Sequence, residues 1–194
     1  MYNFNIIYSA IMGLLILLLE VIITMIKRYY NFFLCLANTG IITKHVAFKN
    51  FSISKSTFYT FLNKNLIIHK GNFIMYGRVT SIYSLSNNSK KILNSMGKAS
   101  YKSSTSQLEH DYLLLKTYCS LPAHIQNTWL NETELQSLYS GITVDGLFMI
   151  DDELFGVEVI TPYYSKNIIE QKKSFADKYC KRLITLNTID IPLK

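Results

Sequence analysis

Residues 39–67, TGIITKHVAFKNFSISKSTFYTFLNKNLI, contain two helix starts in close succession. Thr43 and Ser54 are good N-cap residues, because their side-chain oxygens accept a hydrogen bond from a backbone N–H that the first helical turn leaves unpaired. They predict a short helix over 44–50 and a longer helix over 55–65, with a turn between them.

The predicted helix over 55–65 has an apolar face and a polar face. Phe58, Phe61 and Leu62 follow helical spacing and predict the buried face. The residues left to point outward are Lys55, Ser56, Tyr59, Thr60, Asn63 and Lys64. This helix therefore presents cationic and neutral polar side chains to its surroundings.

The flanking segments add further elements. Residues 26–37 have the apolar spacing of an amphipathic helix, and Gly40 suits its left-handed C-terminal cap. The turn residues Lys70-Gly71-Asn72 predict a β-hairpin. The other expected elements are strands over 66–68, 74–76 and 79–85 and a helix over 89–96. Helix, short helix, turn, third helix and hairpin is the order of a winged helix-turn-helix.

Charge is distributed unevenly along the chain. Residues 21–108 hold 12 Lys or Arg and no Asp or Glu, whereas residues 109–194 hold 12 Asp or Glu and 8 Lys or Arg. The affinity of proteins for nucleic acid comes largely from Lys and Arg that displace condensed counterions. The basic stretch therefore favours double-stranded DNA as a partner, with solubility alone or nearness to anionic lipid as the alternatives.

The winged-helix order assigns positions to the DNA contacts. The start of the third helix reaches base edges or phosphates, and Lys70 and Asn72 are expected at the tip of the wing. The predicted DNA-binding residues are Lys44, Lys55, Ser56, Tyr59, Lys64, Lys70, Asn72 and Arg78. The alternative is a three-helix domain for protein contacts whose lysines are merely solvated.

The second half of the chain mixes helical and strand patterns. Its expected helices cover 108–120, 132–138 and 165–181, and its expected strands cover 143–150, 154–160 and 182–187. The apolar face predicted for the first helix consists of Leu108, Tyr112, Leu115 and Cys119. The order indicates an α/β layer with one crossover connection.

Asp145 at the start of one predicted strand and Glu158 within the next resemble the core of restriction-endonuclease-like folds. That resemblance implies a divalent metal held by the two carboxylates and a Lys two residues beyond the Glu. Ile160 stands at that position, and only Lys172 or Lys173 on the next helix remains to replace the Lys. We therefore expect no catalytic activity, metal or cofactor; a nuclease with Asp145 and Glu158 as ligands is the rival hypothesis. The plainer alternative is a turn Asp and a Glu that is solvated or paired with a Lys.

Residues 6–26, IIYSAIMGLLILLLEVIITMI, are apolar except for Glu20. They reach the length of a membrane-spanning helix, and the cations Lys27 and Arg28 that follow predict an anchor on the cytoplasmic face of a membrane. Glu20 opposes insertion by roughly 3 kcal/mol. The alternative is a cytoplasmic protein whose first helix packs on the C-terminal domain or on a second copy of the chain.

These patterns predict an α+β protein divided into four segments. They are a hydrophobic helix over 1–26, a winged-helix DNA-binding domain over 27–98, a linker over 99–107 and a small α/β domain over 108–194. The three cysteines are widely spaced and are typical of reduced thiols in a cytosolic protein. No P-loop, GxGxxG or GxSxG motif is present, which excludes the NTPases, dinucleotide-binding proteins and hydrolases that carry them.

Three stretches together resemble the replication-relaxation family of plasmids and mobile elements over residues 25–187. They are the stretch 39–67, LEHDYLLL at 108–115 and VDGLFMIDDELFGVEVITPYYS at 144–165. The resemblance implies an N-terminal winged helix and a DNA-binding accessory role in plasmid replication, relaxation or mobilisation. The C-terminal domain would bind a partner protein or a second copy. Where the family often has an acidic residue shortly after the strand Glu, this chain has Ile160-Thr161. A membrane-bound regulator or scaffold that does not bind DNA is the remaining alternative.

Overall fold

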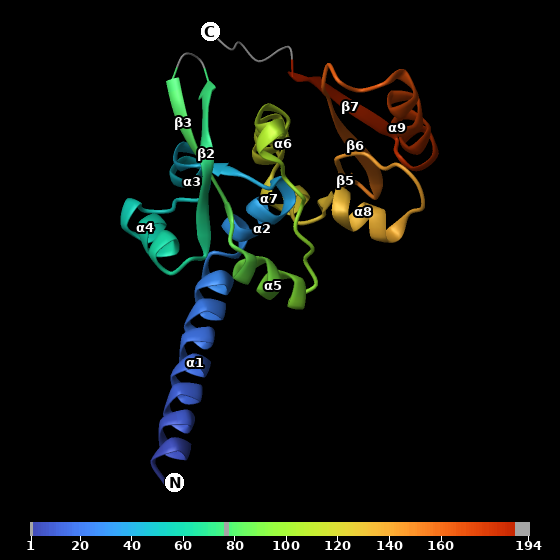
Figure 1. The fold of residues 1–194 in the computed structure, drawn as a ribbon. Coiled ribbons are helices and arrows are strands. Elements are labelled where there is room, and N and C mark those ends of the chain that lie inside the picture. The colour runs from blue at the N-terminus through green and yellow to red at the C-terminus, as the bar shows by residue number, and fades with distance from the viewer. Residues whose placement is uncertain (1, 76–77, 189–194) are drawn as a thin grey trace.

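The computed structural model describes residues 2–75 and 78–188, which form a mixed α+β structure with two β-sheets (Figure 1). The first sheet has three antiparallel strands in the order β1-β3-β2, and the second has four strands in the order β4-β5-β6-β7. Helix α6 runs between the two sheets, and α9 lies on the far side of the second sheet (Figure 1).

The first two helices meet at a break that the sequence did not indicate. The sequence predicted a single helix over 26–37. In the structure α1 (Tyr2–Arg28) ends within that range, and α2 (Tyr30–Thr39) follows after Tyr29. Tyr29 leaves helical geometry (φ −113°, ψ 35°), and its ring packs edge-on against Phe61 at 5.2 Å between centroids. The C-terminal cap is confirmed, because Gly40 has φ 78° and its N–H donates to Leu36 O.

Both predicted N-caps are confirmed. Thr43 Oγ1 accepts from Val46 N at 3.2 Å and starts α3 (Lys44–Asn50), and Ser54 Oγ accepts from Thr57 N at 3.1 Å and starts α4 (Lys55–Asn63). Phe58 and Phe61 of α4 are fully buried. The two caps depend on local hydrogen bonds only, which is why the sequence places these helix starts correctly.

The hairpin differs from the prediction. Strand β2 (Ile67–Met75) continues through the residues expected to form its turn, and β3 (Arg78–Leu85) pairs with it from Arg78 opposite Met75 to Leu85 opposite Ile67. The turn predicted at Lys70-Gly71-Asn72 was therefore wrong. The turn residues mark instead a register shift between His69 and Gly71, where β2 bulges. Pairing along the whole length of β3 stabilises the longer strand.

The rest of the first sheet and its surroundings are short elements. Strand β1 (Ile42–Thr43) pairs with Ile82 and Tyr83 of β3, and α5 (Asn87–Ser95) follows the hairpin from its N-cap Ser86. The predicted closing helix is thus present with a slightly earlier start.

The second half of the chain follows the predicted order closely. Its elements are η1 (Thr105–Gln107), α6 (Leu108–Ser120), α7 (Ala123–Gln126), β4 (Leu130–Asn131), α8 (Glu132–Leu138), β5 (Gly146–Ile150), β6 (Glu153–Ile160), α9 (Lys166–Tyr179) and β7 (Arg182–Asn187). Strands β5 and β6 form an antiparallel hairpin, and α9 carries the chain across to β7, which runs parallel to β6. The one predicted crossover is confirmed.

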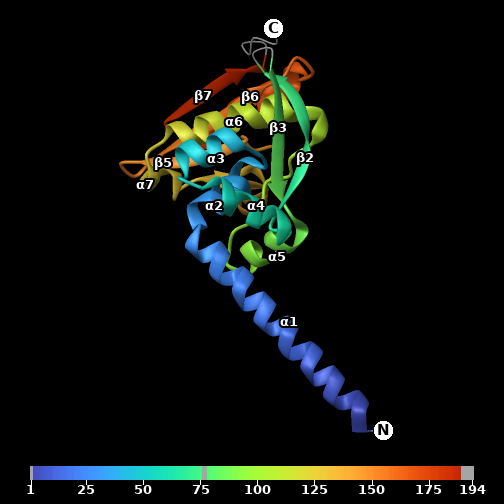
Figure 2. The same cartoon turned by 90° about the vertical axis from the view of Figure 1, so that its left-hand side faces the viewer.

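One continuous apolar core connects the two halves. It contains Phe33 and Phe61 from the first half and Tyr118, Trp129 and Val157 from the second. Helices α2 and α6 contact each other in the body of the molecule (Figure 2). The two halves therefore stabilise each other by shared burial of apolar surface.

The segment predicted as a linker over 99–107 is packed rather than free. Tyr101 is buried, and its backbone N–H donates to Ala37 O at 2.7 Å. Ala99 O accepts from the side chain of Asn131, which ties the segment to the start of α8.

Helix α1 leaves the body and projects from it in both ribbon views (Figures 1 and 2). Among the residues that the structure describes, no helix combines the length and the apolar character needed to cross a membrane.

Candidate functional site

Four ionisable side chains, three from helices or strands and one from a loop, meet inside the second half of the molecule. They are His110 of α6, Asp145 just before β5, Glu158 of β6 and Lys172 of α9, and each is at most 4 % exposed. We call them the buried ionic cluster. Buried charges are unfavourable unless they are paired, so each member depends on the others.

Sheet pairing and the crossover bring the cluster together. Gly146 of β5 is paired with Val157 of β6, which puts Asp145 beside Glu158 across the hairpin. The helix α9 then covers this sheet and brings Lys172 over the two carboxylates, with Nζ 3.1 Å from Asp145 Oδ1 and 2.8 Å from Glu158 Oε2.

Asp145 is the centre of the hydrogen-bond network. Its Oδ2 accepts from Val159 N at 2.7 Å and lies 3.0 Å from His110 Nε2. Its own backbone N–H donates to Glu158 Oε2 at 3.3 Å. The other ring nitrogen of His110 lies 3.2 Å from Asp111 Oδ1, so a protonated imidazole donates to a carboxylate on each side.

The electrostatics favour two cations, His110 and Lys172, next to the carboxylate of Asp145. Burial lowers the pKa of an imidazole, but the hydrogen bonds to Asp111 and Asp145 outweigh it and raise the pKa of His110 to about 10. Burial likewise opposes the charge on Lys172, yet Asp145 and Glu158 hold its pKa above the ordinary value. His110 and Lys172 are therefore protonated at neutral pH.

The two carboxyls differ in their titration. Burial raises the pKa of a carboxyl, but the hydrogen bond and charge of His110 and the charge of Lys172 bring the pKa of Asp145 below its usual value. Burial and the charge of Asp145 raise the pKa of Glu158 to about 8. Two carboxyls with pKa values moved apart in this way carry different charges near neutral pH.

The sequence located part of this cluster. Asp145 and Glu158 come together as the rival nuclease hypothesis required, and Lys172, which appeared only as a weak replacement for the Lys absent at Ile160, contacts both carboxylates. His110 was missed. The side chain of Lys173, the other replacement considered, is exposed.

The signal that could have found His110 lies on α6. Of the predicted apolar face of α6, Leu115 is fully buried, Tyr112 and Cys119 are partly buried and pack against the core, and Leu108 is only partly buried. The buried face consists of His110, Asp111, Leu114, Leu115 and Tyr118. A His-Asp pair at helical spacing with two leucines indicates polar residues that turn inward, and such residues need charged partners elsewhere.

A hollow of about 380 Å³ opens beside His110. Its lining includes Gln107, Thr161 and Tyr164, together with Tyr163, which is 93 % exposed. Lys172 Nζ lies 5.2 Å from the centre of the Tyr164 ring, so Tyr164 contacts the cluster and also lines the hollow.

The predicted DNA-binding residues of α4 lie on the surface. Lys55, Ser56 and Lys64 are exposed, and Tyr59 is 41 % exposed. Lys44 of α3 joins them, since its Nζ donates to Tyr59 Oη at 3.3 Å and lies 5.0 Å from the centre of the Tyr59 ring. These five residues thus lie on or next to the outward side of α4.

The residues predicted at the wing tip are placed differently. Lys70 is partly buried within β2 and donates to Ser103 Oγ, and Asn72 Oδ1 accepts from His69 Nε2 at 3.1 Å. The expectation that both form the tip was wrong, because the strand runs on to Met75. Arg78 is exposed at the start of β3, nearer the end of the hairpin.

Comparisons of the chain with protein-family models, with curated proteins and with solved structures gave no match. Within residues 2–75 and 78–188, no group of three or more His, Cys, Asp or Glu is arranged to hold a metal ion.

Proposed function

We propose that the protein binds double-stranded DNA, with α4 as the recognition helix and the β2–β3 hairpin as the wing of a winged helix. The observation that carries the proposal is the outward side of α4, where Lys55, Ser56, Tyr59 and Lys64 are exposed while Phe58 and Phe61 are buried. Cationic and neutral polar side chains on an exposed helix match the phosphates and base edges of a major groove.

The start of α4 supports an anion contact. No acidic residue lies in its first turn, and Lys55 is its first residue. A helix N-terminus already carries a partial positive charge, so a lysine there costs stability and favours a phosphate. Arg78 adds a second exposed cation, at the start of β3 on the hairpin assigned to the wing.

The test is a titration of the full chain with duplex DNA at several salt concentrations. Each phosphate contact lowers log K by about 0.9 per unit of log[salt], so Lys55→Ala and Lys64→Ala each reduce the slope by roughly one unit. Lys173→Ala, at an exposed position on α9, is the matched control and leaves the slope unchanged. A flat salt response of the wild-type chain contradicts the proposal.

The fragment spanning only the first half is unsuited to this test. Its buried Phe33 and Phe61 belong to the same apolar core as Trp129 and Val157, so removal of the second half exposes that core. The full chain, kept in solution with a mild detergent because of α1, is the right material.

A role in replication, relaxation or mobilisation of a plasmid or other mobile element is a proposal that rests on the sequence resemblance. In that role the second half, with its excess of acidic residues, binds a partner protein or a second copy of the chain. This assignment is tested by a pull-down that compares the wild-type chain with a variant whose acidic surface residues in the second half are reversed in charge. Loss of the bound partner or second copy in the variant supports it.

The gathering of Asp145, Glu158 and Lys172 favours a nuclease as a second candidate. A divalent metal does not fit the cluster as arranged, because Lys172 Nζ lies between the carboxylates at 3.1 Å and 2.8 Å, where the cation would bind. We therefore expect no Mg²⁺- or Mn²⁺-dependent cleavage of plasmid DNA by the purified chain. Nicking that is abolished by both Asp145→Asn and Glu158→Gln, with the fold intact, would establish the nuclease instead.

A further inference from the structure

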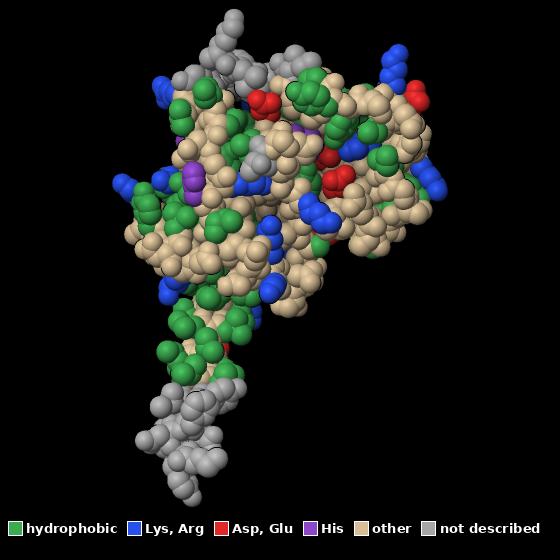
Figure 3. All heavy atoms as spheres, viewed as in Figure 1, with side chains coloured by type: hydrophobic (Ala, Val, Ile, Leu, Met, Phe, Trp, Pro, Cys, Tyr) green, Lys and Arg blue, Asp and Glu red, His purple; other side chains and the backbone are tan. Residues whose placement is uncertain are grey.

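From Ile11 to Leu19 the exposed surface of α1 is apolar in every direction, and the exposed polar residues Glu20 and Thr24 follow nearer the body. Ile22 and Met25 pack against the core and Ile26 is buried, whereas the six consecutive residues Leu14–Leu19 are each 48–60 % exposed. Successive residues of a helix are rotated by about 100°, so six of them cover the whole circumference. Figure 3 shows these hydrophobic side chains as a column that stands clear of the body.

An all-round apolar helix requires an all-round apolar environment. A helix that docks in one groove of a partner protein has an apolar stripe on one side and polar residues on the other. The described part of α1 has no such polar side between Ile11 and Leu19. A lipid phase covers every direction at once, and a second copy of α1 covers only one.

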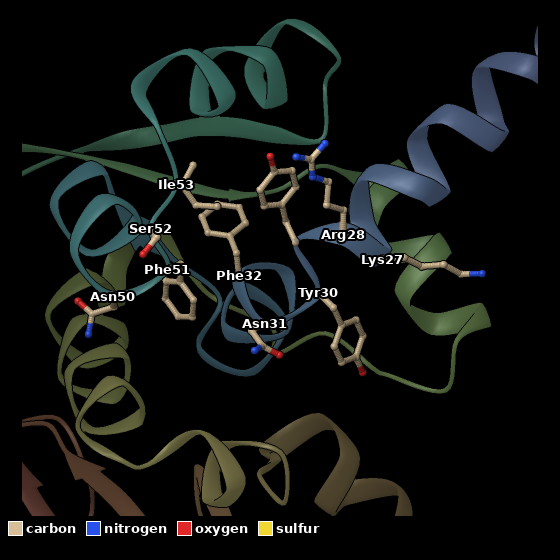
Figure 4. Close-up of a pocket in the computed structure, with 10 residues that line it drawn as sticks. Lys27, Arg28, Tyr30, Asn31, Phe32, Asn50, Phe51, Ser52 and Ile53 are labelled. Carbon is tan, nitrogen blue, oxygen red and sulfur yellow. The ribbon is translucent and has the colours of Figure 1, made fainter.

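The base of α1 has the chemistry of a membrane interface. Lys27 and Arg28 end the helix and are exposed, and with Tyr30 and Asn50 they line a hollow of about 450 Å³ (Figure 4). No Asp or Glu is among the lining residues. Arg28 lies over the ring of Tyr29 at 5.4 Å from its centre. Cations and tyrosines at the end of an apolar helix match the headgroup layer, and cations there attract anionic lipid.

We propose that α1 docks the protein on a bilayer that contains anionic phospholipid. The exposed apolar residues of α1 enter the hydrocarbon, and Lys27 and Arg28 contact the headgroup phosphates. The segment Ile11–Val21 rises by about 16 Å, the depth of roughly one leaflet. Glu20 lies one residue, about 1.5 Å along the axis, inside the Val21 end of this segment and so stays nearer the headgroups than the bilayer centre. This proposal goes beyond DNA binding and does not depend on it.

Flotation of the full chain with vesicles tests the proposal. We expect the chain to float with vesicles of phosphatidylcholine and phosphatidylglycerol, and Leu17→Lys to weaken this partitioning by at least about 100-fold. Leu17 is 60 % exposed, so the substitution leaves the body folded. The matched control is Val79→Lys, at a 73 % exposed position on β3, which floats like the wild type.

A second pair of measurements isolates the headgroup contact. Replacing both Lys27 and Arg28 by Ser reduces partitioning onto the anionic vesicles by about 30-fold, with a much smaller change on phosphatidylcholine alone. Excess inorganic phosphate does not release the wild-type chain. Equal flotation by wild type and Leu17→Lys overturns the proposal. Release of the chain by inorganic phosphate indicates a site for the free anion and also overturns the proposal. A third contrary outcome is an oligomer that forms without vesicles and that Leu17→Lys disperses, because it indicates a second copy as the partner.

Discussion

The two halves of the molecule place their charges in opposite ways. Residues 21–108 carry cations without a single acidic residue and leave most of them on the surface, as at Lys55 and Lys64. The second half buries a His, a Lys and two carboxyls inside a shared cluster. Exposed, unpaired cations contribute little to stability and are available to a ligand. Buried ones are held by their partners, and the loss of one leaves the others unpaired.

Helix starts show part of the same contrast. Helices α6 and α8 have acidic residues in the first turn, which complement the partial positive charge of a helix N-terminus. Helices α3, α4 and α5 have none there, and neither has α9 in the second half; α4 begins with Lys55 and α9 with Lys166. These helices lack a local source of stability, and the DNA proposed above would supply an anion at the start of α4.

The largest effect that separates the two halves is expected at Lys172. Replacing it by Met leaves Asp145 and Glu158 without their shared cation, and we expect the free energy of unfolding to fall by about 3–5 kcal/mol. Lys181→Met is the matched control, because Lys181 pairs with Glu153 at the surface, with both side chains about half exposed. Its expected cost is about 0–1 kcal/mol. Equal losses in denaturant titrations of the two variants would show that the cluster is not a buried charge network.

The second effect is a dependence of stability on pH. His110 has a folded-state pKa of about 10 against an ordinary value of 6.5, so between these values the native state holds more protons than the unfolded state. The stabilisation is complete below the unfolded value and is lost as pH rises through the folded one. Glu158, with its pKa raised to about 8, acts in the same direction at lower pH.

We therefore expect the free energy of unfolding to fall by up to about 1.4 kcal/mol per pH unit for each of these groups as pH rises above neutrality. Between about pH 8 and pH 9.5 the His110 contribution dominates, and His110→Gln removes it. His124→Gln, at an exposed position, retains the wild-type slope. Thermal unfolding across this range measures both, and an unchanged slope in His110→Gln would assign the titration to other groups.

The smallest effect is expected in the basic half. Lys55→Ala removes a cation from the N-terminal end of α4 and stabilises the protein by a few tenths of a kcal/mol, while Lys49→Ala removes one from the last turn of α3 and destabilises it by a similar amount. Chemical denaturation of the two variants checks this prediction. A large loss of stability in Lys55→Ala would mean that this lysine has a structural partner, which weakens its assignment to DNA.

Much of the local structure was predictable from the sequence. The N-caps Thr43 and Ser54 and the cap Gly40 fix helix ends through hydrogen bonds within a few residues. The ends of α6 and β7 also fall where their patterns predict. The charge asymmetry follows from composition alone, and the winged-helix and DNA-binding interpretations built on it stay predictions.

What depended on distant pairing was decided by tertiary structure. The register with β3 overrode the turn residues of β2, which removed Lys70 and Asn72 from the wing tip. His110 and Lys172 lie 62 positions apart in the sequence, and only the β5–β6 hairpin and the α9 crossover bring them to Asp145. Local hydrogen bonds and periodicity depend on residues that are close in the sequence. Burial, register and ion pairing depend on which surfaces meet when the whole chain packs. The sequence by itself therefore determined the elements and the charge distribution, and the packed structure determined which of those charges are held inside.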